Sequence, residues 1–220
     1  MELLGPAGSG KTSLLAALRD RGLSIRDGVR PCDVSCAPLA ARSALRLPPG
    51  YVLRAARTTR RTDAWWGPRD SLRSMVYLEH WLRTCRDPAA AAGGIVMYDH
   101  GPLFRLGTLW TWGPPRTSRF VEWWETMRSA WAERLSLVVW LDAPNPVLLD
   151  RIRRRDRWHP CRELPDPQAS AWLSAYRSAL RRALEPSGAA SRSDLMTFDT
   201  EAAGAEAIAA ALAPRLGSHG

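Results

Sequence analysis

Apolar runs alternate along the chain with amphipathic segments, a pattern typical of alternating strands and helices. Five runs that end at turn or acidic residues predict strands, at Met1–Leu4, Leu23–Arg26, Gly94–Asp99, Leu137–Leu141 and Leu195–Phe198. Short, continuous apolar strands separated by helices indicate a parallel sheet that is covered on both faces. The sequence therefore predicts an α/β fold.

Between these strands, apolar residues recur at helical spacing. Phe120, Trp124, Met127 and Trp131, for example, form a stripe that we expect to face the core. The predicted helices are Lys11–Asp20, Pro38–Leu45, Tyr51–Thr59, Pro68–Arg86, Pro102–Trp110, Ser118–Arg134, Pro146–Arg155, Pro167–Leu184 and Ala202–Leu212. Because no repeat or low-complexity linker interrupts them, we expect residues 1–220 to form a single domain.

The first predicted strand leads into a glycine-rich octet. Gly5 to Thr12 fits G-x-x-x-x-G-K-[ST], in which backbone N–H groups surround phosphates and the threonine hydroxyl binds Mg²⁺. The alternative is a glycine-rich turn with an isolated lysine, but the strand before the octet and the helix after it favour the phosphate loop. The residues expected to bind ATP are Gly5, Pro6, Ala7, Gly8, Ser9, Gly10, Lys11, Thr12 and Ser13.

Lys11 is the only lysine among the 31 Lys and Arg residues. A compact ammonium on a flexible stem can follow a phosphoryl group, whereas a planar guanidinium fits that space poorly. We therefore expect Lys11 to be a catalytic residue.

Acidic residues follow three of the predicted strands, at the edge of the sheet where ligands bind in such folds. Asp99 is expected to hold Mg²⁺ or accept the acceptor's proton, and the alternative is that it caps the helix near Pro102. Asp27 is a second catalytic candidate, or a turn-forming residue before Gly28. For Asp142 we expect capping of the next helix in preference to a role in the site.

The densest basic block runs from Arg151 to Arg157. Arg151, Arg155 and Arg157 are expected to stabilise the migrating phosphoryl group, and the alternative is a solvated basic face. Trp65 and Trp66 fall in a predicted loop, where they would stack on a planar acceptor or simply pack in the core.

The remaining composition limits partners and location. The formal net charge is +9, but the arginines are scattered, so we do not expect nucleic acid as a partner. No apolar run is long enough to span a membrane and the octet begins at residue 5, which leaves no room for a signal peptide and predicts a cytoplasmic protein. Free thiols are expected for the four cysteines, Cys32, Cys36, Cys85 and Cys161.

Together these motifs resemble the P-loop kinases of nucleosides and nucleotides, especially deoxynucleoside and thymidylate kinases. Asp99-His100-Gly101 stands where those enzymes have Glu-Arg-Ser or Asp-Arg, and Arg151, Arg155 and Arg157 fit the R-x-x-x-R-x-R of their lid. Arg26-Asp27-Gly28 resembles their second-strand acid motif. His100 replaces an arginine that touches both phosphate and acceptor in that family.

The resemblance implies a P-loop NTPase fold of three α/β/α layers, with a five-stranded parallel sheet in the order 2-3-1-4-5. It further implies an acceptor-binding region at residues 29–92, an Arg-rich lid at residues 151–168, and adenine near Asp199–Glu201. It makes Asp27 the candidate base and Asp99 the acid that assists Mg²⁺. Trp65, Trp66 and His100 are then candidates for acceptor binding.

The combined expectation is a Mg·ATP-dependent phosphotransferase acting on a hydroxyl or phosphate of a small acceptor, with nucleosides, nucleotides or related metabolites foremost. One alternative is a polynucleotide 5′-kinase or nucleic-acid-bound ATPase, and another is a non-catalytic nucleotide-binding protein. A GTPase switch is disfavoured because its Asn-Lys-x-Asp motif needs a second lysine. ATP and the acceptor are the expected partners, and a homodimer stays open.

Overall fold

The computed structural model describes residues 1–27, 43–57, 66–84, 95–185 and 194–217. Its strands are β1 (Glu2–Leu4), β2 (Ile25–Asp27), β3 (Ile95–Asp99), β4 (Leu137–Asp142) and β5 (Asp194–Asp199). Its helices are α1 (Lys11–Asp20), α3 (Pro49–Arg57), α4 (Pro68–Thr84), α6 (Pro102–Trp112), α7 (Ser118–Ala132), α8 (Asn145–Arg154), α9 (Asp166–Leu184) and α10 (Ala205–Gly217).

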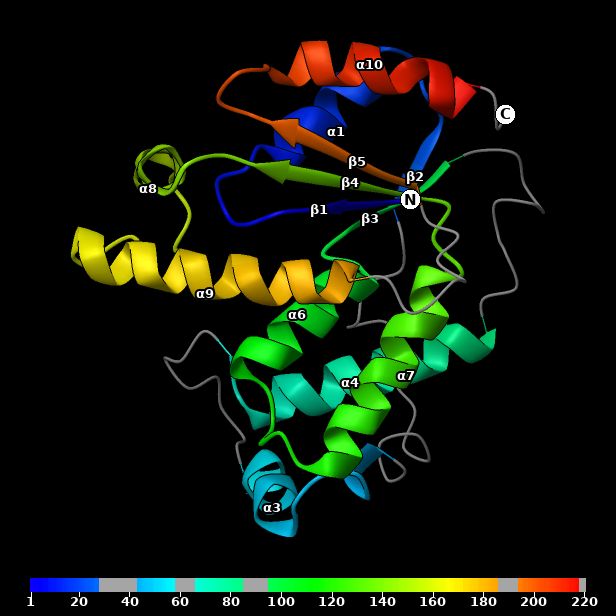
Figure 1. Ribbon diagram of the computed structural model, residues 1–220, viewed down its shortest axis with the longest axis vertical. Coiled ribbons are helices and arrows are strands. Elements are labelled where there is room, and N and C mark those ends of the chain that lie inside the picture. The colour runs from blue at the N-terminus through cyan, green and yellow to red at the C-terminus, as the bar shows by residue number, and fades with distance from the viewer. Residues whose placement is uncertain (28–42, 58–65, 85–94, 186–193, 218–220) are drawn as a thin grey trace.

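The strands form one parallel sheet in the order β2-β3-β1-β4-β5, as expected (Figure 1). The short central strand β1 lies between β3 and β4, with Leu3 opposite both Asp99 and Val139. This register brings the end of β3 beside the point where β1 enters the glycine-rich loop. The acid that ends β3 and the predicted phosphate loop are therefore neighbours.

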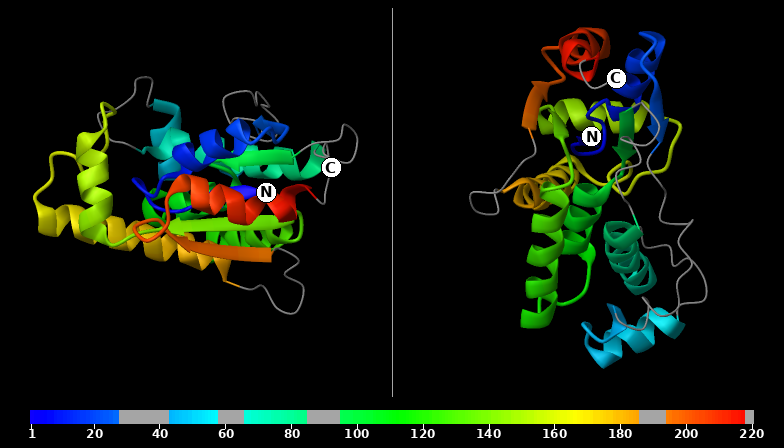
Figure 2. Two further views of the ribbon diagram at one scale, coloured as in Figure 1. Left: turned by 90° about the horizontal axis from the view of Figure 1, so that it is seen from above. Right: turned by 90° about the vertical axis from the view of Figure 1, so that its right-hand side faces the viewer.

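Helices cover both faces of the sheet, α1 and α10 on one and α6 and α9 on the other (Figures 1 and 2). Alternate residues of β1 serve the two layers, because successive strand side chains point to opposite faces. Leu3 packs in the cluster with α1 and α10, and Leu4 packs in the cluster with α6 and α9. The three-layer arrangement thus follows from the apolar strands.

A tryptophan-rich extension of the core lies between α4, α6 and α7, away from α1 and α10 (Figure 1). Phe120, Trp124 and Trp131 of the predicted stripe are buried there, and Met127 is half-buried. Glu79 is also buried, where it accepts a hydrogen bond from the indole of Trp123 at 2.9 Å and pairs with Arg46 at 2.7 Å. This carboxylate joins α4 to α7 and to the segment before α3.

Most predicted elements differ from the structure only at their ends. The exception is the helix predicted over Pro38–Leu45, most of which lies outside the described residues. Of its described residues, Ser43 and Ala44 are helical, and the chain then turns where the N–H groups of Arg46 and Leu47 donate to the carbonyl oxygens of Ser43 and Ala44. Among the described residues, no helix is long and apolar enough to cross a membrane.

Close packing of α6 on α9 generates a stability prediction. A Cβ on Gly107 would lie 2.6 Å from Leu180 Cδ2 and 3.2 Å from Leu180 Cα. Gly107→Val should lower the free energy of unfolding by about 1–3 kcal/mol, measured by urea denaturation, because the helices must separate. Gly50→Val is the matched control, since a Cβ at Gly50 meets nothing within 4 Å; equal stability of both variants would contradict this packing.

Candidate active site

The loop between β1 and α1 is shaped by glycines at its closest contacts. Gly5 has φ 150°, and a Cβ there would lie 2.0 Å from the carbonyl oxygen of Leu141 at the end of β4. Gly8 has φ 85°, and its Cβ would lie 2.8 Å from the carbonyl oxygen of Leu148 in α8. Only glycine allows the loop to lie this close to both elements.

Lys11 is buried inside this loop. Its ammonium donates to the carbonyl oxygens of Gly5 at 2.8 Å and Pro6 at 2.9 Å, and to Ser9 Oγ at 3.4 Å. Burial lowers the pKa of Lys11 to about 8, with Asp99 opposing the shift and Arg155 adding to it. The ammonium is therefore a desolvated cation, held by the loop that surrounds it.

The start of α1 is open to an anion. Its N-cap residue, Gly10, supplies no side-chain hydrogen bond to the first turn, and no acidic residue lies in that turn. The positive end of the helix dipole therefore points at the loop. Thr12 and Ser13 are exposed at this end, and Thr12 lines the adjoining pocket.

Asp99 and His100 form a tight turn beside the loop. His100 has φ 62°, in the left-handed region, and its ring stacks on Phe104 with centroids 4.2 Å apart. Asp99 Oδ1 lies 3.9 Å from His100 Nε2. Asp99 does not cap α6, because Glu2 accepts from the first-turn N–H groups of Leu103 and Phe104. The capping alternative is therefore excluded.

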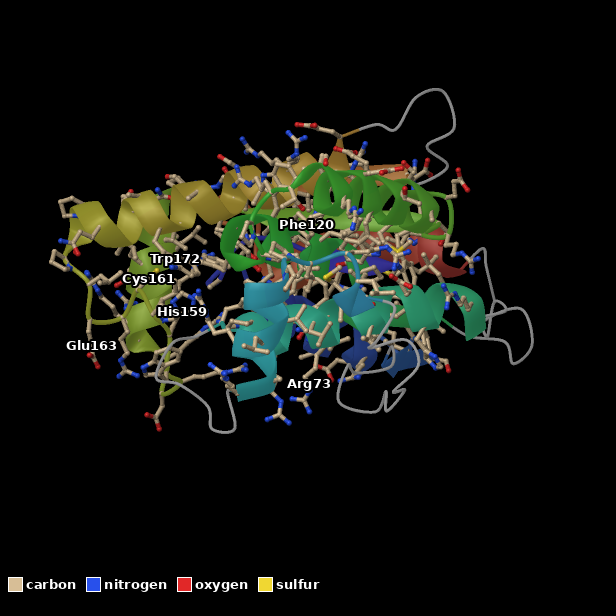
Figure 3. The ribbon with its side chains drawn as sticks, turned by 90° about the horizontal axis from the view of Figure 1, so that it is seen from below. Arg73, Phe120, His159, Cys161, Glu163 and Trp172 are labelled. Carbon is tan, nitrogen blue, oxygen red and sulfur yellow. The ribbon has the colours of Figure 1, made fainter. Side chains whose placement is uncertain are left out.

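The segment after α8 supplies the arginines. Helix α8 ends at Arg154, so Arg155 is the C-cap residue in extended conformation instead of continuing the helix as predicted. Arg155 and Arg157 line the pocket together with Trp158 and His159. His159 lies near Cys161 and Trp172, with its ring edge-on to Trp172 at 5.2 Å (Figure 3).

Arg151 occupies a different place from the other two predicted arginines. Its guanidinium donates to Thr200 Oγ1 at 2.9 Å, to the Thr200 carbonyl at 2.8 Å and to the Gly8 carbonyl at 3.4 Å. It connects the glycine-rich loop to the segment after β5 and does not line the pocket. The structure therefore brings Arg155 and Arg157 to one pocket and places Arg151 beside it, with its guanidinium bonded to the segment after β5.

One pocket of about 150 Å³ unites the remaining groups. Its wall comes from the loop, the β3 turn, α6, α8, the segment that follows α8, and α9. The lining residues are Ala7, Gly8, Ser9, Gly10, Lys11, Thr12, Asp99, His100, Phe104, Ile152, Arg155, Arg157, Trp158, His159 and Tyr176.

The charges that line this pocket suit a polyphosphate. Lys11, Arg155 and Arg157 are cationic, and Asp99 is the carboxylate among the lining residues. Burial and the nearby cations lower the pKa of His159 to about 4, and burial also lowers the pKa of His100. Both imidazoles are therefore neutral at pH 7, and the pocket is net positive.

Several predicted residues lie elsewhere. Trp66 packs against the core and donates its indole N–H to Ser71 Oγ at 2.8 Å, so its packing alternative holds. Asp27 ends β2 with its backbone paired to Met97, whereas Trp65 lies outside the described residues.

Asp142 is not a helix cap. Its carboxylate accepts from Arg177 Nε at 2.8 and 3.0 Å and from the N–H of Ala143 at 2.9 Å. The N-cap residue of α8 is Pro144, so the capping prediction is wrong. Arg177 reaches Asp142 from α9, and no local pattern around Asp142 points to that partner.

Sequence reasoning missed Glu2, Tyr176 and His159. Glu2 belongs to a strand that was predicted from its apolar neighbours, although an acid in such a strand is itself a signal that it has a buried partner. Tyr176 and His159 reach the pocket only through the packing of α9 and of the segment after α8, for which a single sequence offers no signal.

No family model and no curated protein match the sequence. The fold is similar to solved structures of deoxyadenosine kinase from M. mycoides. The structure with bound dATP has a TM-score of 0.51 and 12% identity, covering 97% of this chain and 97% of that chain. The structure with bound dCTP has the same TM-score and identity, covering 99% and 100%. At this identity the likeness shows a shared fold.

His159 should make the protein less stable in acid. Its pKa is about 4 in the folded protein and 6.5 for an unperturbed imidazole. Between these two values the unfolded chain binds a proton at His159 that the folded protein does not bind. The free energy of unfolding is therefore fully retained above pH 6.5 and falls as the pH falls toward 4. His159→Gln should flatten the fall in the free energy of unfolding over this range, followed by urea denaturation at several pH values. An unchanged slope in His159→Gln would show that burial of this imidazole does not control acid stability.

Proposed function

We propose that the protein is a Mg·ATP-dependent phosphotransferase that transfers the γ-phosphoryl group to a hydroxyl or phosphate of a small acceptor. The observation that carries the proposal is one pocket lined by the Lys11 loop, Asp99, Arg155 and Arg157. Phosphoryl transfer needs these parts together: a phosphate cradle, a metal-binding acid and cations on the migrating group. The fold shared with a deoxyadenosine kinase supports the same reaction class.

The donor binds along the loop. Its β- and γ-phosphates accept from backbone N–H groups of residues 6–12 and from the Lys11 ammonium, which exchanges carbonyl partners for phosphate oxygens. The adenine lies toward the segment after β5. Arg151 already connects that segment, through Thr200, to the loop carbonyl of Gly8, so its role is to order the donor site rather than to neutralise the γ-phosphate.

The side chains fit a magnesium ion. Thr12 offers a hydroxyl and Asp99 a carboxylate, both hard oxygen ligands that line the same pocket. No group of three or more His, Cys, Asp or Glu gathers within the described ranges, in keeping with Mg²⁺ that uses few protein ligands and the phosphates of its nucleotide. When bound, Mg²⁺ neutralises phosphate charge.

Transfer proceeds by in-line displacement. The acceptor oxygen forms a bond to the γ-phosphorus as the bond to the β,γ-bridging oxygen breaks, and ADP leaves. The proton of an acceptor hydroxyl passes to a carboxylate, either Asp99 or the second-strand Asp27. Lys11, Arg155 and Arg157 stabilise the charge on the migrating group.

The acceptor side of the pocket is aromatic. Phe104, His100 and Tyr176 line it, and Phe104 packs edge-on to Tyr176 at 5.9 Å. A planar group such as a nucleobase fits rings of this kind. This favours a nucleoside, a nucleotide or a nucleoside-like metabolite.

The high positive charge favours one rival, a polynucleotide 5′-kinase or nucleic-acid-bound ATPase. Such a protein would be retained on DNA or RNA with steep salt dependence, because bound phosphates release counterions. The small-acceptor kinase should elute from such a column at low salt.

Lys11→Ala tests the assignment directly. It removes the buried cation but no apolar core side chain, so turnover of ATP should fall to background while the thermal unfolding midpoint stays near that of the wild type. ADP release by a coupled assay gives the rate. Substantial residual turnover in Lys11→Ala would overturn the enzyme assignment.

Substitutions at two neighbouring arginines distinguish a specific role of Arg155 from a general effect of positive charge. Arg155→Gln should lower kcat by about 10²–10³-fold, because it removes one donor to the developing charge. Arg154→Gln removes the same charge from an exposed side chain paired with Asp150, and kcat should stay within about twofold, as for surface changes away from a site. Equal losses in the two variants would contradict a specific role for Arg155.

A further inference from the structure

Glu2 is a fully buried carboxylate on the central strand, three positions before the glycine-rich loop begins. It points to the face of the sheet covered by α6. Its two oxygens accept from the backbone N–H groups of Leu103 at 3.0 Å and Phe104 at 2.9 Å. A single side chain therefore connects β1 to the first turn of α6.

The first turn of α6 depends on this carboxylate. Its N-cap residue, Gly101, has no side chain to offer, and Pro102 has no N–H. Arg105 N donates to the Gly101 carbonyl, which begins the helical pattern. Glu2 thus accepts the first-turn donors of Leu103 and Phe104, and its charge also suits the positive end of the helix dipole.

The absence of a side chain at Gly101 also makes room for the Glu2 carboxylate. A Cβ at this position would lie 2.8 Å from Glu2 Cδ, 3.0 Å from Glu2 Oε1 and 2.4 Å from Tyr98 Cβ. Residue 101 therefore leaves the space that the Glu2 carboxylate occupies. The Glu2 carboxylate can take this position only because residue 101 is a glycine.

We propose that Glu2 is a positioning residue of the phosphotransfer site, an inference that rests on the proposed function. Its carboxylate fixes the turn of Asp99, His100 and Gly101 relative to the loop that follows β1. His100 sits in a left-handed conformation, which persists only when the surroundings hold it. Holding this turn sets where Asp99 lies relative to Lys11.

The electrostatic surroundings make this role dependent on pH. Burial raises the pKa of Glu2 to about 7, the N–H groups of Phe104 and Leu103 and the amino group of Met1 oppose the rise, and Asp99 adds to it. Tyr176 of α9 also faces this carboxylate, and burial raises the pKa of its hydroxyl, which stays protonated. The ionised carboxylate of Glu2 therefore predominates above pH 7. In this form both oxygens are free of a proton and accept from the N–H groups of Leu103 and Phe104.

Glu2→Gln and Glu2→Met are the test variants, and Glu79→Gln is the matched control. Glu79 is another buried carboxylate, but it lies on α4, and its partners are Arg46, Arg83 and the indole of Trp123 rather than the first turn of α6. Each is assayed with Mg·ATP and the best acceptor at a temperature where it is fully folded. Both Glu2 variants should lower kcat about tenfold or more while the KM for ATP changes less than about threefold. The reason is that the turn of Asp99, His100 and Gly101 shifts, whereas the loop between β1 and α1 stays in place.

The pH profile and amide exchange supply readouts that a general loss of stability would not move. The rise of kcat through about pH 7 should appear in wild type and Glu79→Gln but be absent from Glu2→Gln. Hydrogen exchange at the Leu103 and Phe104 amides should accelerate in the Glu2 variants alone. A Glu2→Gln enzyme with the kcat and pH profile of the control would overturn the proposal.

Hydrogen exchange at the Leu103 and Phe104 amides tests the contact of Glu2 with α6 independently of any enzyme activity. If wild type transfers phosphate to no acceptor, the proposed function fails, while faster exchange at Leu103 and Phe104 in Glu2→Gln still supports the connection of β1 to α6. Unchanged exchange in both Glu2 variants overturns that connection whatever the activity. If neither variant folds, Glu2→Asp replaces them, because its shorter side chain draws the carboxylate back from the Leu103 and Phe104 amides, and wild-type exchange at both amides in Glu2→Asp overturns the proposal.

Discussion

Burial of the Lys11 ammonium is the constraint around which the site is built. A desolvated cation is costly unless polar groups surround it, and here the carbonyls of Gly5 and Pro6 take that place. They can do so only because glycine backbones let the loop lie against β4 and α8. The depressed pKa of Lys11, about 8, reflects how poorly water reaches the ammonium. A phosphate anion would relieve the same cost, so the loop has the electrostatics of a phosphate site.

Parallel pairing brings the remaining chemistry to this cation. Because β1 lies between β3 and β4, the ends of three strands meet at one edge, and Asp99 leaves the sheet beside the loop. Two connections, one buried and one half-buried, then hold neighbouring segments in place. Glu2 joins β1 to α6 behind the Asp99 turn, and Arg151 joins the loop to Thr200 after β5. The pocket is thus held from the sheet side and from the α10 side.

Local patterns in the sequence predicted the features that depend on them. The octet of Gly5–Thr12, the alternation of strands and helices, and the acid after β3 each have a short-range signature, and the family resemblance added the strand order. Glu2, Tyr176 and Arg177 act through contacts with residues far away in the chain, which periodicity does not reveal. Arg151 and Arg155 have helical spacing, but α8 ends before Arg155, and only Arg155 lines the pocket while Arg151 binds Thr200. Trp66 packs against the core, which is one of the two alternatives that its sequence context left open. An aromatic residue that packs and one that binds a ligand look the same in a single sequence.

The lining of the pocket suits transfer of the terminal phosphoryl group of ATP to a small molecule. The direct measurement uses γ-labelled ATP with Mg²⁺ and a panel of nucleosides, nucleotides and hydroxylated metabolites, following label in the acceptor and ADP together. We expect ADP formation that depends on one acceptor class, with one labelled acceptor for each ADP. ADP formed only when DNA or RNA is added, or no transfer to any small acceptor, would contradict it.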